Sequence, residues 1–266
     1  MERPVKSRQI QILYHDEWLI AVNKPPGLLS IPDRFRRDLP HLRGLLERRF
    51  GRLYVVHRLD KGTSGVMLFA RTAEVHRALS LQFEYHRVEK VYHAVLSGVL
   101  EQDTLEVDFP LLPDPHRPGR TIPSARGKEA RTSIRVLARF QVATYVECRL
   151  TTGRLHQVRV HCAAIGHPLL VDPDYGGAPA FFLSSIKRGY KSSPEQPELP
   201  LLARVPLHAL ALAFEHPGTG QRMLIEAPLP KDFRALLHAL QKYAPYTSPP
   251  LEPIYDAVLE PRTRTP

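Results

Sequence analysis

Apolar residues in this chain recur at two spacings, and the shorter spacing predicts strands. Strands are expected where apolar and polar residues alternate, or where a short apolar run lies between turn residues. They are predicted at 10–22, as two strands around a His-Asp-Glu turn, near 55–57 and 66–70, at 89–100, as two strands within 130–150, and at 208–228, as a hairpin closed by GTGQ. These segments predict a sheet of many short strands.

The longer spacing, at i, i+3 and i+4, predicts four helices between and after these strands. They are predicted from Leu42 to a stop at Gly51, from a Thr72 cap through about Ala73 to His86, from about Leu155 to a stop at Gly166 and Pro168, and after residue 230 with an apolar face at Phe233, Leu236, Leu237, Leu240 and Tyr243. Strands outnumber helices and rarely alternate with them. The sequence therefore predicts an α+β protein, with a mixed, mainly antiparallel sheet and flanking helices.

Prolines mark three segments that we predict to be irregular or mobile, at 110–128, 184–204 and from Pro245 onward. The chain has 26 prolines, about twice the average share. No internal repeat is visible, and no linker divides the chain convincingly. We predict one domain over residues 10–244, followed by a Pro-rich tail at 245–266.

Charge and composition narrow the class of partner. The 37 Lys and Arg exceed the 27 Asp and Glu, and the formal charge of +10 favours a polyanionic partner such as RNA or DNA. Both cysteines, Cys148 and Cys162, stand in apolar surroundings and are expected to be buried reduced thiols. The N-terminus lacks a signal-peptide core and no apolar run reaches 18 residues, so we expect a cytoplasmic protein with no membrane partner.

Cofactor motifs are missing from the sequence. There is no G-x-x-x-x-G-K-[ST], no strand-associated G-x-G-x-x-G and no H-E-x-x-H, so no cofactor is predicted. His156, His161 and His167 do not share one helix face, and no cysteine or carboxylate completes a ligand set, so no metal is predicted either. The GTSG string has the wrong spacing for a nucleophile elbow, and a serine hydrolase would need a His or acidic partner near Ser64.

Three residues carry candidate chemistry, although each has a simpler explanation. Asp60 lies in a predicted turn within VVHRLDKGTSGVMLFA, where Asp and Gly suit turn geometry. Arg159 lies beside the apolar stripe of the third predicted helix, where a partly buried guanidinium would need a carboxylate partner. Tyr92, in EKVYHAVLSG, is an aromatic on a strand, which is usually a packing residue.

Taken together, these stretches closely resemble the RluA-type family of RNA pseudouridine synthases. The matching strings are HRLDKGTSGVMLFA, KVYHAVLSG and GRLHQVRVHCAAIGHPLLVDPDYGG, with VNKPPGLLSIP before them and LHALALAFEHPGTG and IEAPLP after them. The resemblance covers about residues 10–240. One departure is Leu155, where the family more often has Thr or another polar residue.

By this resemblance, Asp60 is the catalytic aspartate, Tyr92 the active-site aromatic and Arg159 the basic partner of the aspartate. Arg58 matches an arginine that such enzymes insert into the RNA stack where the target base leaves. The other residues predicted to bind RNA lie in the same motifs: His57, Thr63, Ser64, Lys90, His156 and Gln157.

The resemblance implies a pseudouridine synthase catalytic fold, with two subdomains around a central cleft. Many relatives carry an S4 RNA-binding domain; here the core pattern begins by about Ile10, so none is expected, and the chain is most similar to the branch without it. That branch acts on large-subunit ribosomal RNA and on a tRNA anticodon stem-loop. The implied function is isomerisation of uridine in ribosomal RNA, tRNA or both, as part of rRNA or tRNA processing, with no protein partner. The alternative is an RNA-binding or RNA-chaperone protein with the same fold and no essential catalysis.

From the chemistry, we expect the carboxylate of Asp60 to be ionised although it is buried against a base. Burial raises the pKa of a carboxyl group and a nearby arginine lowers it. The sequence therefore predicts an ion pair between Asp60 and Arg159. Tyr92 is expected to stack on the uracil or to help remove its C5 proton, and stacking is favoured because a phenol is a poor base at neutral pH.

Overall fold

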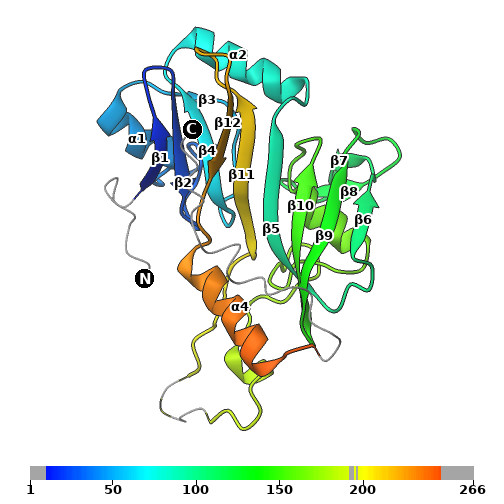
Figure 1. The fold of residues 1–266 in the computed structure, drawn as a ribbon. Helices are drawn as coiled ribbons and strands as arrows, with labels where there is room; N and C mark the ends of the chain where they lie inside the picture. Colours follow the sequence, from blue (N-terminus) through cyan, green and yellow to red (C-terminus); the bar gives the residue numbers. More distant parts are fainter. Residues whose placement is uncertain (1–9, 192–194, 196, 247–266) are drawn as a thin grey trace. The chain divides into compact units, whose positions relative to one another are not determined.

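A computed structural model describes residues 10–191, 195 and 197–246 of the chain. Its helices and strands, in chain order, are β1 (Gln11–His15), β2 (Leu19–Lys24), α1 (Leu42–Phe50), β3 (Tyr54–Val55), β4 (Ser64–Ala70), α2 (Ala73–Glu84), β5 (Glu89–Ser97), β6 (Thr104–Val107), β7 (Leu111–Pro113), β8 (Thr121–Pro123), β9 (Thr132–Arg139), β10 (Ala143–Leu150), α3 (Gln157–Ala164), β11 (Leu207–Glu215), β12 (Arg222–Glu226) and α4 (Lys231–Tyr243). Figure 1 follows this order by colour.

The chain forms two compact units, and each is made of two separate segments. Unit 1 comprises Met1–Tyr92 and His208–Ala227, and unit 2 comprises His93–Leu207 and Pro228–Pro266. The chain passes from one unit to the other inside β5, at the start of β11 and just after β12. The predicted class is confirmed, because most strand pairs are antiparallel and helices accompany the strands in both units.

Unit 1 contains a sheet in which β2 pairs antiparallel with both β1 and β4. The alternation of side chains along β2 and β4 gives this sheet two buried faces. One face packs against α1 and includes Ile20 and Met67, and the other packs against α2 and includes Leu19 and Val66. Helices therefore cover the sheet on both sides, which explains why all seven residues of β4 are buried.

The other long strand of unit 1, β11, pairs with β4 in parallel, with His208 opposite Ser64. Gly65 has a positive φ of 119°, and a Cβ at this position would lie 2.1 Å from the carbonyl oxygen of Ala209. Glycine is therefore required where the two backbones approach. The hairpin partner β12 pairs antiparallel with β11, as the GTGQ turn predicts.

Unit 2 contains strands in the order β5-β10-β9-β6, in which β9 pairs antiparallel with both β10 and β6. Its largest core cluster is organised by α4, whose predicted apolar face is confirmed. Phe233, Leu236, Leu237 and Leu240 of α4 are buried in this cluster, and Tyr243 packs against it.

One sequence prediction in unit 2 was wrong. Residues 110–128 were expected to be irregular, but β7 and β8 form an antiparallel two-stranded sheet within them. Strands of three residues that end in Pro113 and Pro123 are too short to show a periodic pattern. In the second segment, a short 3-10 turn at Leu183–Ser185 and a bridge between Phe181 and Leu202 add local order. The tail prediction lies, from residue 247 onward, outside the described residues.

No helix within the described ranges has both the length and the apolar character needed to cross a bilayer.

Candidate active site

Asp60 lies in a tight turn just before β4. The N–H of Thr63 donates to the carbonyl oxygen of Asp60 at 3.1 Å and closes the turn. Asp60 is partly buried, whereas the neighbouring Arg58 is exposed. The predicted turn is therefore confirmed, and it presents Arg58 to solvent two residues before the carboxylate.

Ser30 holds the residue before Asp60. Its hydroxyl donates to the carbonyl oxygen of Leu59 at 2.6 Å and accepts from the N–H of Leu59 at 3.1 Å. Ser30 and Leu59 are both buried, at 4% and 6% exposure. One side chain thus satisfies both main-chain groups of Leu59 and fixes the backbone that leads into Asp60.

Lys24 holds the residue after Asp60. Its ammonium group is fully buried and donates to the carbonyl oxygens of Leu28 at 2.8 Å, Pro25 at 3.1 Å and Lys61 at 3.3 Å. The N–H of Gly27 also donates to the Lys61 oxygen, at 2.8 Å. The segment from Lys24 to Ser30 therefore forms hydrogen bonds to the residues on both sides of Asp60.

Tyr92 packs against the same core cluster as Leu59. Burial of the phenol is the main cause that raises its pKa, and the negative charge of Asp60 raises it further. Tyr92 therefore keeps its proton at neutral pH. Asp60 and Tyr92, predicted from separate motifs, both belong to unit 1 and are close enough to interact electrostatically.

Two other predicted residues of unit 1 have strongly shifted pKa values. Burial lowers the pKa of His57 to about 3, and the charge of Lys90 lowers it further. The Nε2 of His57 accepts from the N–H of Leu68 at 3.0 Å, and the ring stacks on Phe83. Burial also lowers the pKa of Lys90, to about 8. His57 is therefore a neutral ring that ties the start of the turn to β4.

Ser64 has the histidine partner that a serine nucleophile would need. Its hydroxyl lies 2.9 Å from Nδ1 of His208, and Nε2 of His208 lies 3.0 Å from the carbonyl oxygen of Ala227. Ser64 and His208 are only 1% and 0% exposed, so a substrate has no access to the hydroxyl. This pair fastens β4 to β11 and does not support a hydrolase. Thr63 is also buried, and its hydroxyl has no hydrogen-bond partner among the described residues.

In unit 2, Arg159 lies in the first turn of α3 and is only 6% exposed. It donates to both oxygens of the fully buried Asp172, from Nε and from a terminal nitrogen, each at 2.7 Å. The same terminal nitrogen donates to Asp174 at 2.8 Å. The guanidinium carbon lies 4.9 Å from the centre of the Tyr175 ring. The prediction that Arg159 needs a carboxylate partner is confirmed, with partners supplied by the loop after α3.

His156 and Gln157 lie just before Arg159. Nδ1 of His156 lies 2.8 Å from the Tyr175 hydroxyl, and His156 has a left-handed backbone with φ of 56°. Gln157 is buried, and its amide bonds to Thr132 and Thr152, among others. Gln157 therefore joins α3 to β9, and the RNA-binding roles of both residues stay predictions.

The structure groups the predicted residues by unit. Asp60, Tyr92 and five of the predicted RNA-binding residues lie in unit 1, while Arg159, His156 and Gln157 lie in unit 2. Because Asp60 and Arg159 belong to different units, the ion pair between them stays a prediction.

The supporting residues were not predicted from the sequence; they are Lys24, Ser30, Asp172, Asp174 and Tyr175. A signal was present in the sequence, since these residues lie in NKPPGLLS and DPDYGG, which are parts of the strings that carry the family resemblance.

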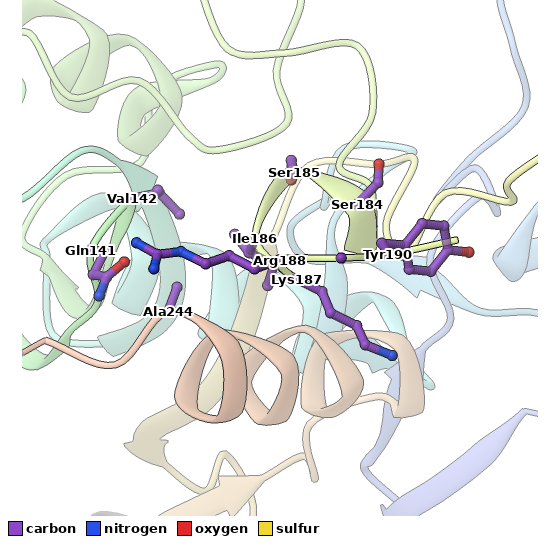
Figure 2. Close-up of a pocket in the computed structure, with 10 residues that line it drawn as sticks. Gln141, Val142, Ser184, Ser185, Ile186, Lys187, Arg188, Tyr190 and Ala244 are labelled. Carbon is purple, nitrogen blue, oxygen red and sulfur yellow. The ribbon is translucent and has the colours of Figure 1, made fainter. Parts of the chain in front are cut away.

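A cavity of about 390 Å³ in unit 2 contains none of the predicted residues. Its charged lining residues are Lys187 and Arg188. Figure 2 shows these two side chains extending in opposite directions, so they do not converge on one anion. Within the part of the chain that the structure describes, no three His, Cys, Asp or Glu side chains are grouped so that they could hold a metal ion.

The strand-rich α+β architecture and the HRLDKGTSG turn define a class of RNA-modifying enzymes. This chain belongs to the RNA pseudouridylate synthase family, whose family model matches residues 18–164. The predicted family resemblance is therefore confirmed.

Individual relatives are similar over most of this chain. Ribosomal large subunit pseudouridine synthase D of Nitrosomonas europaea is 38% identical over 240 residues, which cover 87% of this chain and 65% of that protein. Dual-specificity RNA pseudouridine synthase RluA of Vibrio cholerae is 38% identical over 215 residues, which cover 80% of each chain. The chain spans between 61% and 65% of the length of the synthase D proteins from Nitrosomonas europaea and Neisseria meningitidis.

Solved structures support the fold. Human RNA pseudouridylate synthase domain containing 1 and domain containing 4 each match with a TM-score of 0.65 at 24% identity. The match covers 86% of this chain and 87% of the first structure, and 87% of this chain and 93% of the second.

Proposed function

We propose that this protein is an RNA pseudouridine synthase that isomerises specific uridines in structured RNA and needs no cofactor. Large-subunit ribosomal RNA, tRNA or both are the proposed substrates, because the relatives above are named as ribosomal large subunit and dual-specificity enzymes. The proposed catalytic domain is residues 10–244, and the proposed location is the cytoplasm.

One observation carries the proposal. A carboxylate, Asp60, stands on a turn that is held on both sides by buried side chains, within electrostatic reach of a protonated tyrosine. Fixing the backbone in advance lowers the entropic cost of bringing a nucleophile to a substrate. An ordinary surface turn has no need of such support.

The proposed reaction exchanges bonds within one nucleotide. As the bond between uracil N1 and ribose C1′ breaks, positive charge develops on the sugar, which the carboxylate of Asp60 stabilises or traps covalently. The released uracil turns, its C5 bonds to C1′, the carboxylate leaves, C5 loses its proton and N1 gains one. One carboxylate suffices, because the leaving group is also the group that returns.

The other predicted residues have supporting roles in this scheme. The raised pKa of Tyr92 favours stacking on the uracil over removal of the C5 proton. The positive charge of Arg159 would help to keep Asp60 ionised. A uridine in a stem must leave the stack, which costs a few kcal/mol, and the exposed guanidinium of Arg58 is suited to fill the gap. Phosphate contacts of the basic surface would add affinity with little sequence information.

The experiment maps pseudouridines in ribosomal RNA and tRNA from cells that lack the protein. Wild type is expected to restore the missing sites, and Asp60→Asn, which keeps the shape and removes the charge, is expected to lower the rate at least about 10³-fold. Asp108→Asn, at an exposed position of unit 2, serves as the matched control.

If Asp60→Asn restores the same sites as wild type, the catalytic assignment is wrong. If no site changes when the protein is absent, while the purified protein still binds RNA, the RNA-binding or chaperone alternative replaces the enzyme.

A further inference from the structure

The loop between β2 and α1 exposes an aromatic side chain among arginines. In this loop, residues 31–40 and hereafter the Phe35 loop, the sequence is IPDRFRRDLP. Phe35 is 87% exposed, more than any other large apolar residue that is described. Keeping a phenyl ring in water forgoes about 1.5–3 kcal/mol of burial energy, so an exposure this high calls for an explanation.

Local hydrogen bonds give the tip of this loop a defined shape. One carboxylate oxygen of Asp33 accepts from the N–H of Phe35 and from the N–H of Arg36, both at 2.8 Å. Arg36 in turn pairs with Asp38 at 3.2 Å. This is an Asx-type turn, which orients the Phe35 side chain through its backbone.

Both ends of the Phe35 loop are fixed to the residues that hold the Asp60 turn. The N–H of Leu42 donates to the carbonyl oxygen of Leu29 at 2.8 Å, and that of Arg43 donates to Ser30 at 3.2 Å. Ser30 is also the residue whose hydroxyl holds Leu59. Because Phe35 is five residues from Ser30, its Cα lies within about 18 Å of the Ser30 Cα. The exposed ring therefore belongs to the surroundings of Asp60 in unit 1.

The charges beside Phe35 favour a polyanion. The guanidinium carbon of Arg34 lies 5.9 Å from the centre of the Phe35 ring. Arg34 and Arg37 are exposed, and within the described residues neither forms an ion pair. An aromatic face next to unpaired guanidinium groups is the combination that binds single-stranded nucleic acid, where bases stack and phosphates meet cations.

We propose that Phe35 stacks on an unpaired base of the RNA substrate, close to the strand that contains the target uridine, while Arg34 and Arg37 contact its phosphates. The inference rests on the proposed function, because it takes RNA as the substrate. The contact is tolerant of base identity, since every base has a π-face. The preferred ligand is therefore RNA with an unpaired nucleotide near the target, such as a loop.

The test measures binding of full-length protein to a single-stranded oligouridylate and to a fully paired RNA duplex. All variants carry Asp60→Asn, so that turnover does not complicate binding. Phe35→Ala is expected to raise the Kd for the single strand about five- to hundredfold and to leave duplex binding unchanged. Phe35→Tyr is expected to bind like the parent, and Phe35→Leu like Phe35→Ala. Leu199→Ala, at a residue 84% exposed in unit 2, is the matched control.

The salt dependence of RNA binding distinguishes the contribution of base stacking by Phe35 from that of phosphate contacts by Arg34. Phe35→Ala is expected to lower affinity without changing the slope of log K against log salt, whereas Arg34→Gln lowers that slope by about 0.7. Phe35→Trp adds a fluorophore to a chain with one native tryptophan, and its fluorescence relative to the parent is expected to be quenched by the oligouridylate.

Unchanged single-strand affinity in Phe35→Ala, or parent-like affinity in Phe35→Leu, overturns the inference. These binding results are independent of catalysis. If wild type makes pseudouridine and Phe35→Ala binds normally, only this inference fails; if wild type makes none, the proposed function fails. Because Phe35 is exposed, an unchanged Tm verifies that each variant is folded.

Discussion

Around Asp60 in unit 1, the supporting hydrogen bonds go to main-chain atoms of Leu59 and Lys61, whereas around Arg159 in unit 2 they go to the guanidinium itself. The first arrangement fixes where residue 60 stands through bonds that involve no atom of its carboxylate. The second fixes the charged group directly and surrounds one positive charge with two negative ones.

The two charged groups are therefore held in different ways. The turn that carries Asp60 is placed through the backbone of Leu59 and Lys61. A guanidinium has five N–H donors, so it can be anchored by Asp172 and Asp174 and still contact another group. The two carboxylates also weaken the field that Arg159 projects.

The largest loss of stability is expected when the ion pair between Arg159 and Asp172 is broken. Asp172→Ala removes the fully buried carboxylate that pairs with the buried Arg159, and we expect a loss of about 3–5 kcal/mol in the free energy of unfolding, measured by denaturant titration. Asp174→Ala is the matched control and should cost at most about 1 kcal/mol, because its side chain is 55% exposed. Equal losses in the two variants would contradict the view that Asp172 is the principal anchor.

A smaller loss of stability is expected when the hydrogen bonds from Ser30 to the main chain of Leu59 are removed. Ser30→Ala leaves the N–H and C=O of Leu59 without their buried partner, which should cost about 1–3 kcal/mol. We also expect kcat to fall with little change in KM, since Ser30 acts through the position of Asp60. Amide hydrogen exchange at Leu59 should become faster. Ser184→Ala, at an exposed serine, should change none of these values. An unchanged exchange rate at Leu59 would show that Ser30 does not hold the turn.

A pH-dependent effect is expected from His57, which ties the turn to β4. Its pKa of about 3 in the folded protein lies below the ordinary value of 6.5, so the unfolded chain takes up the proton first as the pH falls. The free energy of unfolding should therefore fall from about pH 6.5 toward pH 3. His57→Gln should flatten this dependence relative to wild type, whereas His116→Gln, at an exposed position, should preserve it. Parallel curves for wild type and His57→Gln would refute the assignment.

Features with a local sequence pattern were predictable in both units, and features that depend on distant residues were not. The helices and most strands were predictable, because Leu42 to Gly51 or Phe233 to Tyr243 show their periodicity and end signals within a short stretch. The parallel pairing of β4 with β11 was not, because it joins residues 144 positions apart and has no local signature. The sheet of β7 and β8 was missed because each strand has only three residues.

For the site, motif resemblance selected Asp60, Tyr92 and Arg159, and physical reasoning correctly required a carboxylate for Arg159. It also predicted Asp60 as a partner of Arg159, which stays a prediction, and it did not find Asp172 and Asp174 in the loop after α3. The identity of an ion-pair partner depends on how a loop returns to its helix, which periodicity does not encode. The role of Lys24 was not predictable because a lysine is rarely fully buried, as this one is at the end of β2.

The split composition of unit 1 bears on how the protein is made. Its second segment, His208–Ala227, leaves the ribosome only after all of His93–Leu207 has been synthesised. At about 5–20 residues per second, the 144 residues between Ser64 and His208 take about 7 to 30 s to translate. During this interval β4 lacks its parallel neighbour, and the hydroxyl of Ser64 lacks its histidine. The strand that follows the Asp60 turn therefore acquires its parallel neighbour late, and chaperones have a defined time window in which to protect the exposed edge of β4.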